Sequence, residues 1–419
     1  MHYGIIAIGS RGDVQPFVAL SLGLKQKGHQ VTLLAHENFK SFVESYHIDF
    51  HPLGGNTEEM VQDPEGLRLL QSGNTLKLLR YIHDRGAKVQ DRVNQDLWEG
   101  CQPADVLVTS VLGVPWVSSI AEKMGKQWAL VQLSFPTTAT REFPFAGFDY
   151  FNFPVYNLFT YRLIRSFFWR QIKGAVNELR MSLGLPTLRH SIFDKAASDH
   201  ILTYYAVSSA LLHRPADWDS SIKVTGFLSL PAQLDESVRN IPPGLRDWLQ
   251  GGEKPIYIGF GSMPIPDPAL FTRVLKELLA RTDHRYIFCE GWSSVSELSK
   301  DPRLFIVPAV DHEWLFPQCK AAIIHGGIGT LAATLKAGIP PVIVSIFGDQ
   351  HWWGKLIRKS GLGGHIPFKL LSPDKLIAAI HSVLLPEVTQ HLARMAGHLN
   401  GEDGLHNAIA NLEEYFLSG

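Results

Sequence analysis

The sequence contains little cysteine and no excess of charge of either sign. Its three cysteines, Cys101, Cys289 and Cys319, are scattered and lack the spacing of metal ligands or of a disulfide framework. We therefore interpret them as buried residues of a protein from a reducing compartment. Lysine and arginine together number 39 and aspartate and glutamate 40, which gives a net charge of −1. This balance argues against a nucleic-acid partner and against broad electrostatic attraction to a membrane.

Long hydrophobic runs are also missing. No uninterrupted apolar stretch approaches the length that is needed to span a bilayer. A strand is predicted from Tyr3 onward, which leaves no room for the basic and apolar regions of a secretory signal. We therefore expect a cytoplasmic protein.

The sequence does contain enough apolar residues for two cores. Of its 419 residues, 45% are hydrophobic and 19% are charged, a composition typical of folded proteins. A chain of this length exceeds a single core and should divide into two domains of ordinary size. We expect these domains at residues 1–215 and 241–395, a linker at 216–240, and a C-terminal helix at 396–419 that packs back on the first domain.

The chain opens with a pattern typical of a parallel α/β sheet. A strand is predicted at residues 3–8, a helix at 14–27 that ends at Gly28, and a second strand at 30–35. In such sheets, ligands bind at the carboxyl ends of the strands. The loop at that end does not match the dinucleotide fingerprint Gly-x-Gly-x-x-Gly; it is Gly9-Ser10-Arg11-Gly12-Asp13.

Asp13, at the start of the first helix, has two interpretations. An aspartate in this place commonly caps the N-terminus of the helix. It could also be a general base that faces the cleft between the two domains. The residues alone do not decide between these roles. For Arg11 we favour a surface position over an ion pair with Asp13.

The stretch 143–169 has the most unusual composition in the chain. Nearly every second or third residue is Phe, Tyr or Trp, and the Pro and Gly among them argue against one regular helix before Pro154. Aromatic residues most often pack in a core. They could also form the wall of an acceptor pocket, because small-molecule sites are mostly apolar. A third interpretation is an interfacial membrane patch, because Arg162, Arg165 and Arg170 lie among them. We favour the pocket over membrane contact, and the two do not exclude each other.

Two glycine-rich turns mark the second half of the chain. Gly-Phe-Gly-Ser-Met ends a predicted strand at 256–259, and His-Gly-Gly-Ile-Gly-Thr ends an apolar run at 321–324. A strand, a glycine-rich turn and a helix together aim backbone N–H groups and the positive end of a helix dipole at an anion. Gly326, Gly327 and Gly329 would let phosphate oxygens approach the backbone closely.

The residues around the second turn favour a ligand over a turn built for geometry alone. His325 and Thr330 add side-chain donors on either side of it. Glycines alone would suit either interpretation. A Gly-Asp-Gln sequence follows the next apolar run, and acidic and amide side chains are what the hydroxyls of a sugar require. The sequence therefore favours a ligand that carries both phosphate and sugar.

In their order along the chain, five motifs resemble those of the family 1-type nucleotide-sugar-dependent glycosyltransferases. They are GSRGDVQP at 9–16, GFGSM at 259–263, VPAVDHEWLFPQC at 307–319, HGGIGT at 325–330 and FGDQHWWG at 347–354. Within that family the chain looks most like sterol glucosyltransferases and bacterial antibiotic and natural-product glycosyltransferases. The segment SFPTTATREFPF also looks like the acceptor-domain segment of the sterol enzymes.

The resemblance covers nearly the whole chain and implies its fold. Members are α/β proteins with two facing Rossmann-like domains, the GT-B arrangement. They have a deep interdomain cleft and a C-terminal helix that crosses back to the N-terminal domain. The C-terminal domain of such a protein holds the sugar donor, and the N-terminal domain holds the acceptor.

The resemblance also implies the donor site. Residues that match the positions holding the donor diphosphate are His325, Gly327, Gly329 and Thr330, with Ser262 on the adjacent loop. Those that match the remaining donor contacts are Val310 for the base, Trp292 near the base and ribose, and Asp349 and Gln350 for the sugar hydroxyls.

On the acceptor side, Asp13 matches the aspartate proposed as the base in the antibiotic enzymes. Plant members instead carry a histidine near this place with an aspartate partner on a later strand, whereas here that strand ends Val108-Thr109-Ser110. Plant members also carry a ribose-binding glutamate where this chain has Ala333. The predicted acceptor-binding residues are Ser10, Arg11, Phe135, Phe143, Phe145 and Phe148.

We therefore predict an inverting transfer of a hexose to a hydrophobic small molecule: a sterol, a flavonoid or other polyphenol, or a polyketide aglycone. The expected co-substrate is UDP-glucose or another UDP-sugar, with a TDP-sugar as the alternative, and no cofactor is expected. No Asp-x-Asp or clustered histidines with ligand spacing lie near the site, so no divalent metal is expected either. We expect a monomer, with peripheral membrane contact through 143–169 as an addition.

Two other functions remain open from the sequence. A nucleotide-sugar epimerase can share the two-domain fold, but it would need no apolar acceptor pocket and so no aromatic stretch at 143–169. A non-catalytic nucleotide-sugar or lipid binding protein would not need Asp13 together with Asp349 and Gln350.

Overall fold

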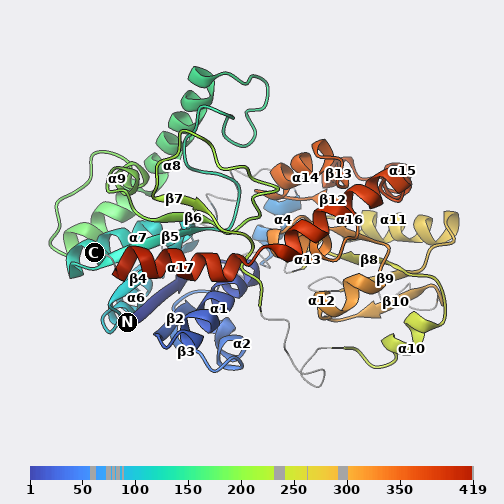
Figure 1. Ribbon diagram of the computed structural model, residues 1–419, viewed down its shortest axis with the longest axis horizontal. Coiled ribbons are helices and arrows are strands. Elements are labelled where there is room, and N and C mark those ends of the chain that lie inside the picture. Colours follow the sequence, from blue (N-terminus) through green and yellow to red (C-terminus); the bar gives the residue numbers. More distant parts are fainter. Residues whose placement is uncertain are drawn as a thin grey trace. The chain divides into compact units, whose positions relative to one another are not determined.

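The computed structural model describes residues 1–56, 63–71, 77, 81, 85–86, 89–230, 241–261, 263–290 and 301–417. It divides into two compact units (Figure 1). The first comprises Met1–Thr57, His83–Leu230 and Glu402–Gly419, and the second comprises Glu58–Ile82 and Pro231–Gly401. Each unit contains one parallel sheet with helices packed against it.

The first unit is built on a seven-stranded parallel sheet. Its strands, in spatial order, are β3 (Asp49–Leu53), β2 (Gln30–His36), β1 (His2–Ala7), β4 (Val106–Ser110), β5 (Gln127–Gln132), β6 (Thr203–Tyr205) and β7 (Ile222–Val224). In the centre, Ile5 of β1 lies opposite Leu33 of β2 and Val108 of β4. The strand order reverses between β1 and β4, and ligands of doubly wound sheets bind outside such a reversal.

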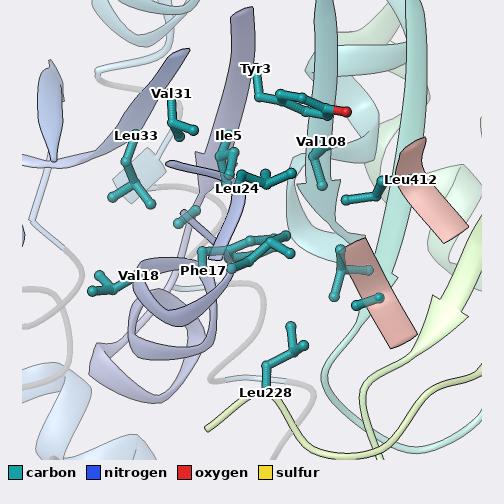
Figure 2. Packing of buried hydrophobic residues seen from close by; sticks show 14 of the residues in the cluster. Tyr3, Ile5, Phe17, Val18, Leu24, Val31, Leu33, Val108, Leu228 and Leu412 are labelled. Atoms are coloured by element: carbon teal, nitrogen blue, oxygen red, sulfur yellow. The ribbon is translucent and has the colours of Figure 1, made fainter. Parts of the chain in front are cut away.

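Helices cover both faces of this sheet. On one face, α1 (Arg11–Gln26) and α17 (Gly404–Leu417) pack over residues such as Ile5, as Figure 2 shows for Phe17 and Leu412. On the other face, the core around Ile6 and Leu34 is covered by α6 (Gln90–Cys101), α7 (Val114–Met124), α8 (Pro154–Ser182) and α9 (Ile192–Ser198). Successive residues of β1 thus enter opposite cores, because side chains alternate along a strand. The short α2 (Lys40–Glu44) lies between β2 and β3 in the chain.

The second unit repeats the same topology with six strands. Their spatial order is β10 (Leu304–Val307), β9 (Tyr286–Cys289), β8 (Ile256–Gly259), β11 (Ala321–Ile324), β12 (Pro341–Ser345) and β13 (Gly364–Pro367). Its helices are α4 (Pro64–Gln71), α10 (Leu245–Gln250), α11 (Pro268–Arg281), α12 (His312–Leu315), α13 (Ile328–Lys336), α14 (Gln350–Lys359), α15 (Pro373–Val383) and α16 (Pro386–Gly401). The strand order reverses between β8 and β11, which are the strands that precede the two glycine-rich turns.

The C-terminal helix packs on the first unit, as the sequence predicted. Gly23 of α1 makes room for it, because a Cβ at that position would lie 2.4 Å from a methyl group of Ile409. His29 and Glu413 pair at 3.0 Å. The helix begins at Gly404 and is separate from α16, whereas one segment from residue 396 was expected.

Two other expectations need correction. The stretch 216–240, predicted as a linker, contains β7, which pairs with β6 at the edge of the first sheet. The sequence missed it because three half-buried residues are too few to show strand alternation. The first helix begins at Arg11 and not at residue 14, because Ser10 and Asp13 cap its N-terminus.

Candidate functional site

Three loops converge at the carboxyl edge of the second sheet. They follow β8, β11 and β12, which are neighbours in the sheet. A Cβ on Gly261 would lie 3.1 Å from the imidazole of His325, and one on Gly326 would lie 3.5 Å from the Cα of Gln350. The two glycine-rich turns and the Gly-Asp-Gln loop, far apart in sequence, therefore line one site in this unit.

The three glycines of the turn after β11 have different structural roles. Gly326 has a φ of 96°, which other residues rarely adopt. A Cβ on Gly327 would lie 2.4 Å from Nε2 of His325, so the imidazole occupies that space. A Cβ on Gly329, in contrast, would meet nothing within 4 Å. Packing explains the first two glycines, whereas the third leaves the first turn of α13 open to a ligand.

The N-terminus of α13 points into this opening. Gly327 is its N-cap and provides no side-chain cap. The first N–H groups of a helix have no acceptor within the helix and carry the positive end of its dipole. Thr330 adds a half-buried hydroxyl in the same turn. This arrangement suits a phosphate group.

His325 is held in its neutral form. Burial, and to a smaller extent the neighbouring His312, lowers its pKa to about 4. Its Nδ1 is buried and has no hydrogen-bond partner among the described residues. Buried polar atoms are rarely left without a hydrogen bond, so we expect this nitrogen to bond to an oxygen of a ligand.

Asp349 and Gln350 begin α14 and hold the loop after β12. The Oε1 of Gln350 accepts hydrogen bonds from the backbone N–H groups of Ile346 at 2.8 Å and Phe347 at 3.1 Å. The indole of Trp353 donates to Asp349 Oδ2 at 3.1 Å. Since the Oε1 of Gln350 is engaged by the loop, its amide group is the part that can donate to a sugar hydroxyl.

A polar cluster that sequence reasoning missed lies behind this loop. The hydroxyl of Ser345, at the end of β12, lies 2.5 Å from Nδ1 of His351 and 2.7 Å from Nε2 of His365. One hydroxyl hydrogen serves two imidazoles, so one histidine donates to the oxygen and the other accepts from it. A Cβ on Gly354 of α14 would lie 2.2 Å from His365, so that glycine admits the ring. The three residues are 6 to 20 positions apart in sequence, and no spacing signal could have found them.

Of the remaining residues predicted to bind the donor, the structure describes only some. Val310 is half-buried after β10, beside the Asp311 N-cap of α12. His312 of α12 is tied to the sheet through Tyr257, whose hydroxyl lies 2.9 Å from its Nε2. Ser262 and Trp292 lie outside the described residues, so their predicted roles stay predictions.

Asp13 lies at the reversal point of the first sheet. Its Oδ2 accepts hydrogen bonds from the backbone N–H of Ser10 at 2.7 Å and from the Ser10 hydroxyl at 3.0 Å. Gly9 permits this, because a Cβ there would lie 2.3 Å from the same oxygen. Burial raises the pKa of Asp13 above its usual range, against the opposing effect of the Ser10 bonds. The capping role is confirmed, and the other oxygen and the raised pKa are compatible with a base as well.

Arg11 does not pair with Asp13. Its guanidinium lies 4.2 Å from the centre of the Phe42 ring, and the side chain is exposed. The surface interpretation of Arg11 is therefore confirmed, and its predicted contact with an acceptor gains no support from this geometry.

The aromatic stretch is divided into two parts. Phe145 is buried and packs edge to face against Phe135 at 5.2 Å and Tyr161 at 5.6 Å. Phe143 and Phe148 are half-buried in the same loop. From Tyr150 onward the aromatic side chains are largely exposed. The first part can line an apolar pocket, whereas the second leaves most of its aromatic rings at the surface and buries Tyr161 and Trp169.

Two polar residues at the carboxyl ends of strands were not predicted. Ser110 ends β4 and Gln132 ends β5, both buried. The Ser110 hydroxyl and the Gln132 Oε1 have no hydrogen-bond partner among the described residues. They lie on neighbouring strands at the edge where Asp13 lies, so they are candidates to bind a polar group of the acceptor. Isolated polar residues within apolar runs gave no sequence signal.

Within the described ranges, no three His, Cys, Asp or Glu residues are grouped so as to hold a metal ion. The expectation of a metal-independent reaction stays a prediction.

The two repeated sheets and the donor-type edge of the second define a class: nucleotide-sugar glycosyltransferases of the GT-B fold. Family profiles agree with this. Residues 3–88 match the glycosyltransferase family 28 N-terminal domain, and residues 273–399 match the erythromycin biosynthesis protein CIII-like C-terminal domain.

Two sterol 3-beta-glucosyltransferases of Arabidopsis thaliana are similar along 98% of the chain, at 34% and 32% identity, and the chain covers 64% and 67% of their lengths. A UDP-sugar-dependent glycosyltransferase of Dictyostelium discoideum is 30% identical over 98% of the chain, which covers only 26% of that protein. The chain thus spans about two thirds or less of the curated relatives named here. It belongs to the family of nucleotide-sugar-dependent glycosyltransferases that includes these enzymes.

Solved structures agree on the fold. The kitacinnamycin glycosyltransferase superimposes with a TM-score of 0.71 at 19% identity, covering 99% of this chain and 98% of that one. The SsfS6 glycosyltransferase of Streptomyces sp. SF2575, complexed with thymidine diphosphate, gives 0.63 at 17% identity, covering 99% of each chain. The prediction of two Rossmann-like domains is confirmed.

Proposed function

We propose that the protein transfers glucose from UDP-glucose to a hydroxyl group of a hydrophobic small molecule, with a sterol as the first candidate. The observation that carries this proposal is the convergence of the two glycine-rich turns with Asp349 and Gln350 at one edge of the second sheet. Phosphate-binding and hydroxyl-binding groups at one site suit a nucleotide sugar. Relatives named as sterol glucosyltransferases support the choice of acceptor.

The reaction we propose is a direct displacement with inversion. Asp13 accepts the proton of the acceptor hydroxyl while that oxygen forms a bond to the anomeric carbon. The bond from that carbon to the diphosphate oxygen breaks, and UDP leaves with the electron pair. A well-placed base of suitable pKa contributes roughly 10²–10⁴-fold to such a rate. The raised pKa of Asp13 makes it a stronger base than an ordinary aspartate.

The second unit would stabilise the leaving group. Charge develops on the diphosphate as the bond breaks, and preorganised donors aimed at that charge commonly supply the largest share of catalysis. The N-terminus of α13, Thr330 and the unpaired Nδ1 of His325 are such donors. No metal is assigned to this role, and we expect activity to persist in excess EDTA.

The nucleotide and sugar of the donor are part of the proposal. UDP is favoured by the relative named as UDP-sugar-dependent. A thymidine diphosphate is bound in the structurally similar SsfS6. Ala333 leaves no carboxylate for the ribose where plant members carry one, so TDP-sugars are the alternative to test.

A screen of donors against acceptors, with mass detection of products, tests the function. It crosses UDP-glucose, UDP-galactose and a TDP-sugar with a sterol, a flavonol and a macrolactone. We expect a hexosylated sterol from UDP-glucose. An epimerised UDP-sugar without glycoside, or nucleotide-sugar binding without turnover for every pair, would overturn the proposal in favour of an epimerase or a binding protein.

We also propose that the protein is a monomer that works at a membrane surface, because a sterol acceptor is held in bilayers. Size-exclusion chromatography with light scattering tests the oligomeric state.

A further inference from the structure

Five apolar side chains form an exposed patch around the start of α8. Tyr150, Phe151, Phe153, Val155 and Phe159 are 88%, 61%, 51%, 77% and 57% exposed. We call these five residues the aromatic tip. Figure 1 shows the beginning of α8 and the loop before it extending beyond the strands of the first sheet. Large contiguous apolar patches are uncommon on soluble surfaces and mark interaction sites.

The aromatic tip is held in a defined conformation. The rings of Phe151 and Phe153 each lie 5.5 Å from the ring of Tyr156. The Tyr156 hydroxyl donates to the carbonyl oxygen of Phe148 at 3.1 Å. Asn157 donates to Asn152 Oδ1 at 2.8 Å and so fastens the loop to the helix. Since these contacts already fix the rings, their exposure is a property of the fold.

The outer face of α8 continues as a basic surface. At 100° per residue, Arg162, Arg170 and Lys173 lie within roughly 60° of Phe159 around the helix axis. All three side chains are exposed. The buried Asn157 and Tyr161 lie on the opposite side, toward the core, and the buried Trp169 borders the basic surface at roughly 80° from Phe159. Arg165 is excluded from this surface because it pairs with Asp194 at 3.0 Å.

The charge of α8 contrasts with that of the chain. The helix contains five basic residues and a single acidic one, Glu178, whereas the whole chain has a net charge of −1. An exposed apolar surface bordered by basic residues suits an anionic bilayer, because apolar burial and attraction to anionic lipids add together. At about 1.5 Å per residue, Arg162 lies about 5 Å and Arg170 about 17 Å along the axis from Phe159, on the side away from the tip.

We propose that the aromatic tip inserts into the interface of a bilayer containing anionic lipid, while Arg162, Arg170 and Lys173 contact headgroup phosphates. The proposed sterol acceptor gives this contact its purpose, so in that respect it rests on the proposed function. Insertion is peripheral: in the part of the chain that the structure describes, no helix is long and apolar enough to cross a membrane. A second copy of the chain fits this surface less well, since docking α8 on α8 would bring like charges together.

Vesicle flotation with the full chain tests the proposal. The probes are vesicles of phosphatidylcholine alone and of phosphatidylcholine with phosphatidylglycerol. We expect binding to the mixed vesicles that weakens at high salt. The triple variant Tyr150→Ser, Val155→Ser, Phe159→Ser should bind at least about tenfold more weakly, because three inserted apolar side chains are lost. Matched control substitutions at exposed apolar residues elsewhere, Met181→Ser, Leu370→Ser and Leu417→Ser, should bind as the wild type does.

Charge reversal tests the basic surface separately. The variant Arg162→Glu, Arg170→Glu should lose the preference for phosphatidylglycerol. The control Arg273→Glu, Lys359→Glu changes the net charge equally at exposed positions of the second unit and should keep that preference. Equal binding by the two variants would overturn the role of α8, as would undiminished binding by the triple tip variant.

The outcome can be separated from that of the proposed function. Vesicle binding needs no donor or acceptor, so it survives if the glycosyl transfer proves wrong. Conversely, transfer to a water-soluble acceptor without vesicles should be unchanged in the tip variant. Light scattering tests whether a second copy of the chain covers the patch instead. If the wild type is a dimer, the tip variant is a monomer and neither binds vesicles, the patch serves self-association and the proposal is overturned.

Discussion

Asp13 caps α1, and this role is compatible with the base that we propose it to be. One carboxylate oxygen accepts both hydrogen bonds from Ser10 and completes the cap of α1. The cap also fixes the carboxylate at the carboxyl edge of the first sheet. One oxygen is anchored and burial raises the pKa of the carboxyl group, so the cap would also position Asp13 for the proposed role of a base.

Asp13→Asn separates the two roles. The amide oxygen of asparagine can still accept from Ser10, so the cap and the stability of the fold should be kept. Because an amide is not a base, kcat/KM for glucosyl transfer should fall by roughly 10²–10⁴-fold, with unchanged affinity for UDP. Steady-state kinetics with UDP-glucose measure kcat/KM, and calorimetry with UDP measures the affinity. Full activity of this variant would remove Asp13 from the mechanism.

Gly329 gives a second test at the residue scale. The methyl group of an alanine there would meet no neighbour, and alanine is a better helix former than glycine. Gly329→Ala should therefore leave the free energy of unfolding unchanged or raise it by up to about 1 kcal/mol. The same methyl group would stand over the first turn of α13 and should weaken UDP binding. Gly397→Ala in α16 is the matched control, since it also meets no neighbour and lies outside the site. Equal UDP affinities for both variants would contradict the phosphate site.

At the scale of elements, α14 and β13 together support the Gly-Asp-Gln loop. Gly354 in α14 admits the ring of His365 from β13, and His365 meets Ser345 at the end of β12. His351, one residue after Gln350, shares the same hydroxyl. The loop that would bind the sugar is thus fixed from behind by a hydrogen-bonded cluster, not by its own sequence alone.

Gly354→Ala should disturb this support. The new methyl group would displace His365, which we expect to cost about 1–3 kcal/mol of stability and to raise the KM for UDP-glucose. Adding His365→Ala vacates the space and should restore most of the stability but not the KM. Urea unfolding and steady-state kinetics distinguish the two effects. If the double variant is no more stable than Gly354→Ala, the clash is not the cause.

At the scale of the whole molecule, buried neutral histidines make stability depend on pH. The pKa of His325 and the pKa of His365 are both lowered to about 4, whereas an unfolded histidine titrates near 6.5. Between these values the unfolded chain binds more protons than the folded chain, so stability falls as the pH is lowered from about 6.5 toward 4. Each histidine contributes a slope of at most about 1.4 kcal/mol per pH unit in this range.

His365→Gln should therefore flatten the dependence. Urea unfolding at pH 5 and pH 7 should show a smaller loss for the variant than for the wild type, because glutamine does not titrate. His190, an exposed residue, provides the control His190→Gln, which should leave the difference unchanged. An identical difference for the His365 variant and the wild type would contradict the assignment.

The order of strands and helices, the two-domain class and the phosphate-type turns were determined by local sequence. Apolar runs of four to seven residues and glycine at strand ends suffice to predict them, because periodicity and backbone freedom are local properties. The motifs also predicted, as a family pattern, which residues would bind the donor. Short edge strands such as β7 escaped, since three residues carry too little pattern.

Only the tertiary structure decided which of those residues act together. It placed Gly261 against His325 and Gly326 against Gln350, joined Ser345 to two distant histidines, and left Ser110 and Gln132 with unpaired buried atoms. It also divided the aromatic stretch into a packed part around Phe145 and an exposed tip. Contacts between residues far apart in the chain depend on strand order and on which face each side chain takes, and no local pattern encodes either.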